Sequence, residues 1–368
     1  MTDFVWILDR LGEDRTLALG GVLIGALFGF LAQRSRFCLR AAVVEVARGQ
    51  LGPKLAIWLF AFSAAIVMTQ LLIVAGHMET GNVRQLASQG SLSGALIGGL
   101  MFGMGMILAR GCSSRLLVLA ANGNLRALLS GLIFAVTAQA SMSGILSPAR
   151  EALGALWVID GGSARDLLAT FGLGHGGGLL FGLLWLGAGI AFARRSRVPL
   201  WGWLGGLGVG VTVAVAWWFT YQLSTQTFVP TPVKSLSFTG PSADVLMAVL
   251  SPPGQLLNFD LGMVPGVFLG SFLAAWWARE LKLEGFQGGH AMRRYIAGAV
   301  LMGFGGMLAG GCAVGAGVSG AAVFAVTAWV TLFGMWAGAA GTDWLIDRYL
   351  PAHAQGTAPL SPETVGTP

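Results

Sequence analysis

The chain has 368 residues, of which 55% are hydrophobic and only 10% are charged, with a net charge of +6 and a mean hydropathy of +0.73. A soluble globular domain carries about 25% charged residues, so this composition excludes a soluble protein and indicates a polytopic membrane protein. The basic residues lie in short loops between apolar runs, so we expect the lipid bilayer as a partner and no nucleic acid.

Nine apolar runs are long enough to cross about 30 Å of hydrocarbon. They cover about 17–33, 55–76, 91–109, 125–146, 177–193, 200–222, 260–278, 293–310 and 322–346. The segment before them, 1–16, is amphipathic and is typical of a helix at the membrane surface. We therefore predict an all-α membrane protein with about nine transmembrane helices.

Basic residues follow the odd-numbered runs. The clusters are Arg34, Arg36, Arg40, Arg48 and Lys54, then Arg110, Arg115 and Arg126, then Arg194, Arg195 and Arg197, and last Arg279, Lys282, Arg293 and Arg294. By the positive-inside rule these ends are cytoplasmic. The prediction is a multi-pass protein of the bacterial inner membrane with its N-terminus outside and its C-terminus in the cytoplasm.

Each of the three cysteines follows a glycine-notched apolar run at one spacing. Cys38, Cys112 and Cys312 stand nine residues after Gly29, Gly103 and Gly303, and a shift of 200 aligns the second motif with the third. A short apolar segment contains the first cysteine, Phe37–Arg48, and one follows each of the other two, Ser113–Ala121 and Ala313–Ala322. Such segments are too short to span the membrane and are predicted to be re-entrant half-helices. An internal repeat with interrupted helices is the sequence sign of a transporter binding site.

A fourth copy is indicated by Arg195-Ser196-Arg197, which matches Arg34-Ser35-Arg36 and places Pro199 where the first copy has Cys38. We therefore expect one membrane transport domain, 1–346, with two pseudo-symmetric halves of two repeats each. The halves are about 17–146 and 178–346, joined by a linker at 147–177, with a long outer loop at 223–257 and a disordered tail at 347–368.

A cysteine that opens a helical segment has its sulfur near unpaired backbone N–H groups and the positive end of the helix dipole. This favours an anion site, and a thiol is a soft donor suited to a terminal sulfur atom. The candidate substrate-binding residues are Cys38, Cys112, Cys312, Gly111, Gly311, Arg110, Ser113 and Arg36. Arginines at these breaks either draw anions to the mouths of a pore or only set the topology.

Other chemistries find little support. The span interiors lack carboxylates, which argues against a proton relay or sodium site there, and the four histidines show no metal-ligand spacing. We expect no cofactor, no metal and no enzyme. Two alternatives stay open: a membrane thiol enzyme handling persulfide or quinone-linked thiol oxidation, and a channel in which the cysteines only pack.

The motifs FGFLAQRSRFCLRAA, GGLMFGMGMILARGCSSR and GFGGMLAGGCAVGAG resemble the three cysteine motifs of the YeeE/YedE family of sulfur-transport membrane proteins. The resemblance implies inward transport of thiosulfate through a constriction lined by Cys38, Cys112 and Cys312, by transient S–H hydrogen bonds. It also implies a cytosolic TusA-like sulfur carrier as a partner. A selenium species or another sulfur species is the alternative substrate.

Overall fold

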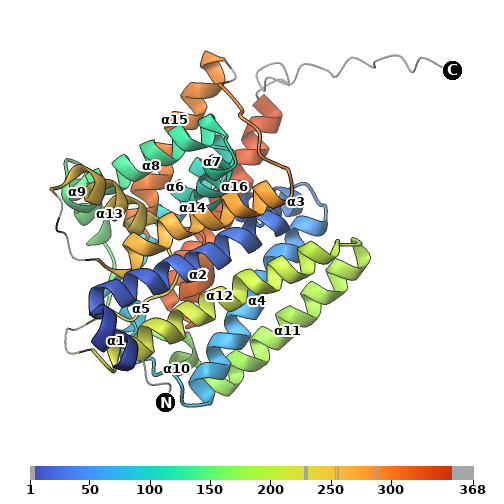
Figure 1. Cartoon of the computed structure of the whole chain (residues 1–368). Coiled ribbons are helices and arrows are strands. Elements are labelled where there is room, and N and C mark those ends of the chain that lie inside the picture. The colour runs from blue at the N-terminus through green and yellow to red at the C-terminus, as the bar shows by residue number, and fades with distance from the viewer. Residues whose placement is uncertain (1–4, 228–230, 253, 255–256, 287, 350–368) are drawn as a thin grey trace.

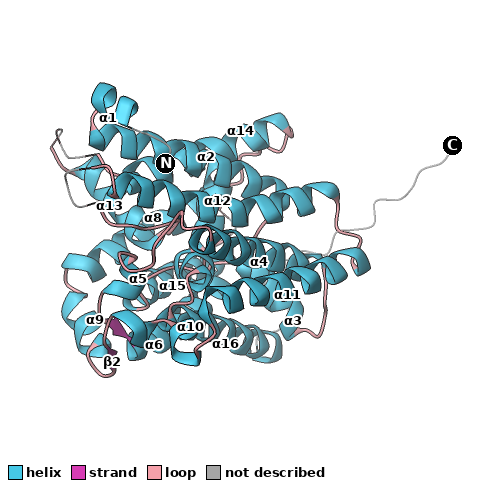
Figure 2. Cartoon of the chain, turned by 90° about the horizontal axis from the view of Figure 1, so that it is seen from below, coloured by secondary structure: helices cyan, strands magenta, loops and turns pink. Residues whose placement is uncertain are grey.

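The computed structural model describes residues 5–227, 231–252, 254, 257–286 and 288–349, and these are almost entirely helical (Figure 1). The first half contains α1 (Val5–Leu11), α2 (Glu13–Ser35), α3 (Leu39–Ala47), α4 (Pro53–Val74), α5 (Arg84–Ala87), α6 (Leu92–Leu108), α7 (Ser113–Ala121) and α8 (Leu125–Ser143). The rest contains α9 (Ser147–Gly154), the 3-10 helix η1 (Gly162–Arg165), α10 (Leu167–Phe171), α11 (Gly174–Arg195), α12 (Leu200–Ser224), α13 (Thr239–Leu250), α14 (Phe259–Trp277), α15 (Gly289–Leu308), the π-helix η2 (Gly315–Gly320) and α16 (Val326–Tyr349). The strands β1 (Gly90–Ser91) and β2 (Val158–Ile159) form a short antiparallel pair, and helices joined by loops dominate the view in Figure 2.

The all-α polytopic fold is confirmed. Within the described residues, seven helical stretches are long and apolar enough to cross a membrane, and they coincide with the first seven expected runs. The remaining two runs coincide with α15 and α16, of 20 and 24 residues. The expected disordered tail, 347–368, begins inside α16, and its residues 350–368 lie outside the described residues.

The connections alternate between two ends of the bundle. Helices α5, α9, α10 and α13, which follow even-numbered spans, lie along one end, whereas α3 and the turn from α11 to α12 lie at the other (Figures 1 and 2). At this second end Arg36, after α2, pairs with Glu280, after α14, at 3.6 Å. The alternation agrees with the order of the spans, and which end faces the cytoplasm stays a prediction.

Glycines bring α2 and α14 into close contact. A Cβ built on Gly25 would lie 3.1 Å from the Met263 Cα, and one built on Gly270 would lie 2.7 Å from the Ala26 Cα. Because the neighbouring atoms are backbone, only glycine permits this approach. The four-residue glycine spacing of the first apolar run therefore does what small residues do between membrane helices.

The two helices that end before Cys112 and Cys312 cross each other with exchanged contacts. A Cβ on Gly98 would lie 2.5 Å from the Gly305 oxygen, and one on Gly305 would lie 2.7 Å from the Gly98 oxygen. The Gly105 and Gly298 positions meet in the same reciprocal way, at 2.6 Å each. Since Gly98 and Gly298 are repeat equivalents, as are Gly105 and Gly305, this exchange is what a two-fold relation between α6 and α15 would give. It supports the predicted pseudo-symmetric halves, which remain a prediction.

The segment 223–257, expected as a long outer loop, is more structured than that. It contains the end of α12 and all of α13, and between them Val233, Leu236 and Phe238 are almost fully buried. Irregular backbone is tolerated at membrane depth only where its polar groups find partners. Here the Thr220 hydroxyl donates to the Lys234 carbonyl at 2.6 Å, and the Ser319 hydroxyl donates to the Leu236 carbonyl at 2.8 Å. This stretch, 231–238, is called the buried strap below.

Candidate functional site

Four helices of the repeat end in the same way. Arg36, Arg110, Arg197 and Gly310 follow α2, α6, α11 and α15, and each adopts the left-handed conformation, with φ of 55°, 57°, 48° and 75°. In each case the next residue donates its N–H back to the fifth residue before it, as Gly111 does to Met106 at 3.1 Å. This hydrogen bond and conformation terminate a helix as a Schellman motif. The predicted breaks are thereby confirmed, and Cys38, Cys112, Pro199 and Cys312 each come two residues after the left-handed residue.

The cysteines then begin the next segments. Cys38 and Cys112 are the residues that precede the first turn of α3 and α7, and both have extended backbone. Their sulfurs face the N–H groups of Ala41 and Arg115, three residues on. Cys312 accepts hydrogen bonds from the N–H of Gly315, again three residues on, and of Phe238, both at 3.3 Å. All three sulfurs therefore lie near backbone N–H groups at the start of a helical segment, the arrangement that the sequence predicted.

The fourth copy has the helix break but has neither a cysteine nor a short segment after it. Pro199 precedes α12, which continues for 25 residues, whereas α3 and α7 are nine residues each. The segment after Cys312 is also short, but it is the π-helix η2. Short segments thus follow only the three breaks that carry a thiol.

Cys38 and Cys112 come together. Their side chains lie next to each other, and the Cys112 sulfur is 3.4 Å from the Ser114 hydroxyl. The half-buried Arg115 guanidinium lies near both thiols and donates to the Gln33 side-chain oxygen at 3.4 Å. Gln33 in turn donates to Glu280 at 2.8 Å. A polar network therefore connects this thiol pair to the end of the bundle where Arg36 lies.

The other predicted residues lie at two locations. Arg36 is exposed and pairs with Glu280, and Arg110 lies near Arg40, which itself faces Cys38. The Ser113 hydroxyl is buried and has no hydrogen-bond partner among the described residues. Gly311 lies elsewhere, with Cys312. The predicted set is thus split between two locations.

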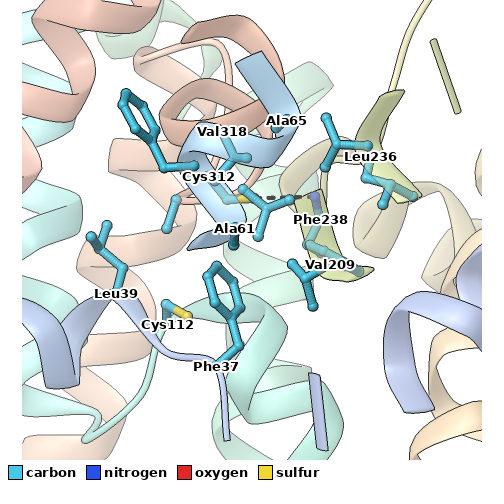
Figure 3. Packing of buried hydrophobic residues seen from close by; sticks show 14 of the residues in the cluster. Phe37, Leu39, Ala61, Ala65, Cys112, Val209, Leu236, Phe238, Cys312 and Val318 are labelled. Atoms are coloured by element: carbon cyan, nitrogen blue, oxygen red, sulfur yellow. Dashed lines mark hydrogen bonds between the residues drawn. The ribbon is translucent and has the colours of Figure 1, made fainter. Parts of the chain in front are cut away.

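Cys312 lies in a second environment. Phe238 of the buried strap and Gly315 of η2 each donate a backbone hydrogen bond to the Cys312 sulfur. Figure 3 shows Cys312 beside Ala61 and Val318, and Cys112 beside Phe37, within one buried apolar cluster. The rings of Phe28 and Phe238 contact each other in this cluster in a tilted arrangement, with centroids 5.4 Å apart. An apolar core thus connects the two environments.

A polar pocket of about 450 Å³ adjoins Cys312. Its inner wall includes Gly311, Gly315 and Ser237, which neighbour Cys312 or the residues that bond to it. The lining also includes charged side chains, most of which belong to the connections that follow even-numbered spans. Burial, and then the nearby Asp260 carboxylate, raises the pKa of the pocket residue Asp244.

Sequence reasoning missed the buried strap and the charged groups of the pocket. It treated Arg115 as an arginine that either draws anions to the mouth of a pore or only sets the topology, and left it out of the candidate substrate-binding residues, although it lies three residues after Cys112. Lys234 and Asp260 form an ion pair at 2.5 Å. Two isolated charges in apolar surroundings would have been the signal for this pair.

Enlarging Gly315 should impair the function of this site. A methyl group there would lie 2.8 Å from the Ser237 Cβ and would push the buried strap away from Cys312. Overpacking strain costs about 1–3 kcal/mol, so for Gly315→Ala we expect the initial rate of anion uptake to fall on the order of tenfold at unchanged membrane abundance. Gly317→Ala is the matched control, because its methyl would meet only the end of the Leu332 side chain at 3.1 Å. Equal rates for the two variants would contradict this role of the strap.

The chain is similar in sequence to known transport proteins. A family model described as sulphur transport matches residues 34–341. The chain is 28% identical over 358 residues to the thiosulfate transporter TsuA of Escherichia coli (strain K12), with 90% of this chain and 95% of that protein covered. It is 26% identical over 322 residues to the thiosulfate transporter TsuA of Spirochaeta thermophila, covering 84% and 93%. A shorter match, 35% over 113 residues, is to the probable transporter YedE of Salmonella typhimurium and covers 30% and 28%.

Proposed function

The chain belongs to the sulphur transport family, and from this premise we propose that it imports thiosulfate across the bacterial inner membrane. The family resemblance of the cysteine motifs is confirmed. The relatives are named as transporters, so the protein is a transporter and not a membrane thiol enzyme. Two relatives named as thiosulfate transporters are covered over more than nine-tenths of their length, which supports thiosulfate as the substrate.

The observation that carries the mechanism is the placement of three thiols at three helix breaks. Desolvating an isolated ion costs tens of kcal/mol in a medium of low dielectric constant, so a permeating anion needs replacements for water along its path. The N–H groups beyond Cys38, Cys112 and Cys312 provide such donors. A protonated thiol adds an S–H donor for the terminal sulfur of thiosulfate, whereas a thiolate would repel the dianion.

We order the cysteines by their surroundings. The anion enters the pocket, meets Cys312 first and passes from the donors there to those at the Cys112 and Cys38 pair. It leaves past Arg115 toward the end of the bundle with Arg36 and Glu280. In this orientation the pocket faces outside and the Arg36 end faces the cytoplasm, as the positive-inside rule predicts. A cytosolic TusA-like sulfur carrier would receive the sulfur at that end.

The test is uptake of labelled thiosulfate by cells that lack other sulfur importers. Cells that produce the intact protein should accumulate label well above cells with an empty vector. An excess of unlabelled selenium analogue or other sulfur anion, added in parallel, measures the substrate range. Absence of thiosulfate uptake, with another sulfur or selenium species transported instead, would replace thiosulfate by that species.

A further inference from the structure

The pocket beside Cys312 has the charge of a site for a divalent anion. Four basic side chains, Arg84, Arg150, Arg165 and Lys234, and two acidic ones, Asp244 and Asp260, line it. When all six are ionised, the lining carries a net charge of +2. Arg150 also pairs with Glu151 at 3.0 Å, outside the pocket. With that pair counted as neutral, Arg84, Arg165 and Lys234 against Asp244 and Asp260 leave the lining a net charge of +1.

Arg165 is the most informative of these cations. Its side chain is nearly buried, with 6% of the residue exposed, and it donates to the Ser88 carbonyl at 2.5 Å and to the Thr327 hydroxyl at 2.7 Å. Among the described residues no carboxylate pairs with it, and its buried Nε lacks an acceptor. A buried, unpaired charge is strongly unfavourable, so the guanidinium is expected to gain an anionic partner that the protein itself does not supply.

Two further groups complete the pocket. The Thr239 residue is 1% exposed, and its hydroxyl has no hydrogen-bond partner among the described residues. Lys234 pairs with Asp260, and this pair keeps partial contact with the pocket, since the side chains are 19% and 11% exposed. The Lys234 ammonium can therefore exchange one carboxylate oxygen for an oxygen of a bound anion. The Thr239 hydroxyl supplies an O–H donor, and both groups recognise oxygen atoms.

We propose that this pocket is a separate binding station for divalent oxyanions, which holds the anion before it reaches Cys312, with Arg165, Lys234 and Thr239 as its ligands. The inference rests on the proposed function and deepens it. The three ligands donate N–H and O–H groups, and Cys312 is not part of the lining. The station therefore binds by charge and oxygen atoms, and discrimination for a terminal sulfur begins only at the thiol.

This division of labour has a direct consequence for sulfate. Sulfate matches thiosulfate in charge and shape but lacks the terminal sulfur. It should occupy the station with an affinity similar to that of thiosulfate and should inhibit thiosulfate uptake competitively. It should not itself be carried past Cys312.

The experiment measures equilibrium binding of labelled thiosulfate and labelled sulfate to the purified, detergent-solubilised full chain. For Arg165→Gln we expect affinity for both anions to fall at least about tenfold, as loss of hydrogen bonds to a charged group implies, with Arg165→Lys intermediate. Arg195→Gln, an exposed arginine at the other end of the bundle, is the matched control and should bind both anions normally. Unchanged affinity in Arg165→Gln, or thiosulfate binding without sulfate binding, overturns the proposal.

Thr239→Val keeps the test valid if Arg165→Gln does not fold. Valine has nearly the same shape and removes a buried hydroxyl that has no partner in the protein, so thermal stability should not fall. Affinity for both anions should still weaken severalfold. Unchanged affinity in a well-folded Thr239→Val protein would also contradict the station.

The same measurements separate this inference from the proposed function. If the intact protein binds both anions but cells do not take up thiosulfate, the station stands and the proposed function fails. If cells take up thiosulfate and the concentration for half-maximal uptake is the same in Arg165→Gln, the proposed function stands and the station fails.

Discussion

Replacing Cys112 or Cys312 by alanine should reduce thiosulfate uptake to the level of cells without the protein. Both residues are fully buried, at 0% exposure, so each substitution removes one sulfur atom from a packed core. The cavity that this leaves is small and costs about 1 kcal/mol, which is modest against a total stability of about 5–15 kcal/mol. The fold should persist. The loss of uptake would then report the loss of the S–H donor.

Serine at the same positions tests the chemistry of the donor. The Cys→Ser substitution retains a hydrogen-bond donor of similar size, but its hard oxygen is a poor match for the terminal sulfur of thiosulfate, so a thiol relay should fail with serine as well. Membrane abundance and elution as a single species are the controls for each variant. Alanine variants of Cys112 and Cys312 that both transport at the normal rate would show that the thiols only pack.

Gly25→Leu or Gly270→Leu should greatly reduce the amount of folded protein. A Cβ at either position would already clash with the facing backbone, at 3.1 Å from the Met263 Cα and 2.7 Å from the Ala26 Cα. The rest of a leucine side chain would force α2 and α14 apart. Overpacking costs about 1–3 kcal/mol even where side chains can adjust, and backbone cannot yield as side chains do. We expect the loss to exceed that range.

The measurement is the monodisperse fraction after detergent extraction, together with the melting temperature of what remains. Gly187→Leu is the matched control, since no atom lies within 4 Å of its built Cβ on the exposed side of α11. Both helices α2 and α14 flank the breaks that carry Arg36 and Glu280, so uptake should fall with folding. Normal extraction and melting of Gly25→Leu would mean that α2 and α14 pack differently.

The sequence by itself determined the parts of this protein that depend on local patterns. Hydropathy over about 20 residues identified the apolar helices, because crossing the bilayer needs that length. The nine-residue spacing from glycine to cysteine located the three helix breaks and the half-helices after them. Ser113–Ala121 was predicted with the bounds that α7 has. These features follow from contacts within one turn or between adjacent turns of the chain.

The tertiary structure decided which of these features meet. Cys38 and Cys112 share one environment and Cys312 another, although their motifs are equivalent. The buried strap supplies the Phe238 N–H to Cys312 from a segment that read as an outer loop. Arg165 is buried through contacts with Ser88 and Thr327, residues far from it in sequence. Apolar helices of similar composition give no sign of which partner they choose, so the pairing of helices, and with it the pocket and its unpaired cation, emerged only from long-range packing.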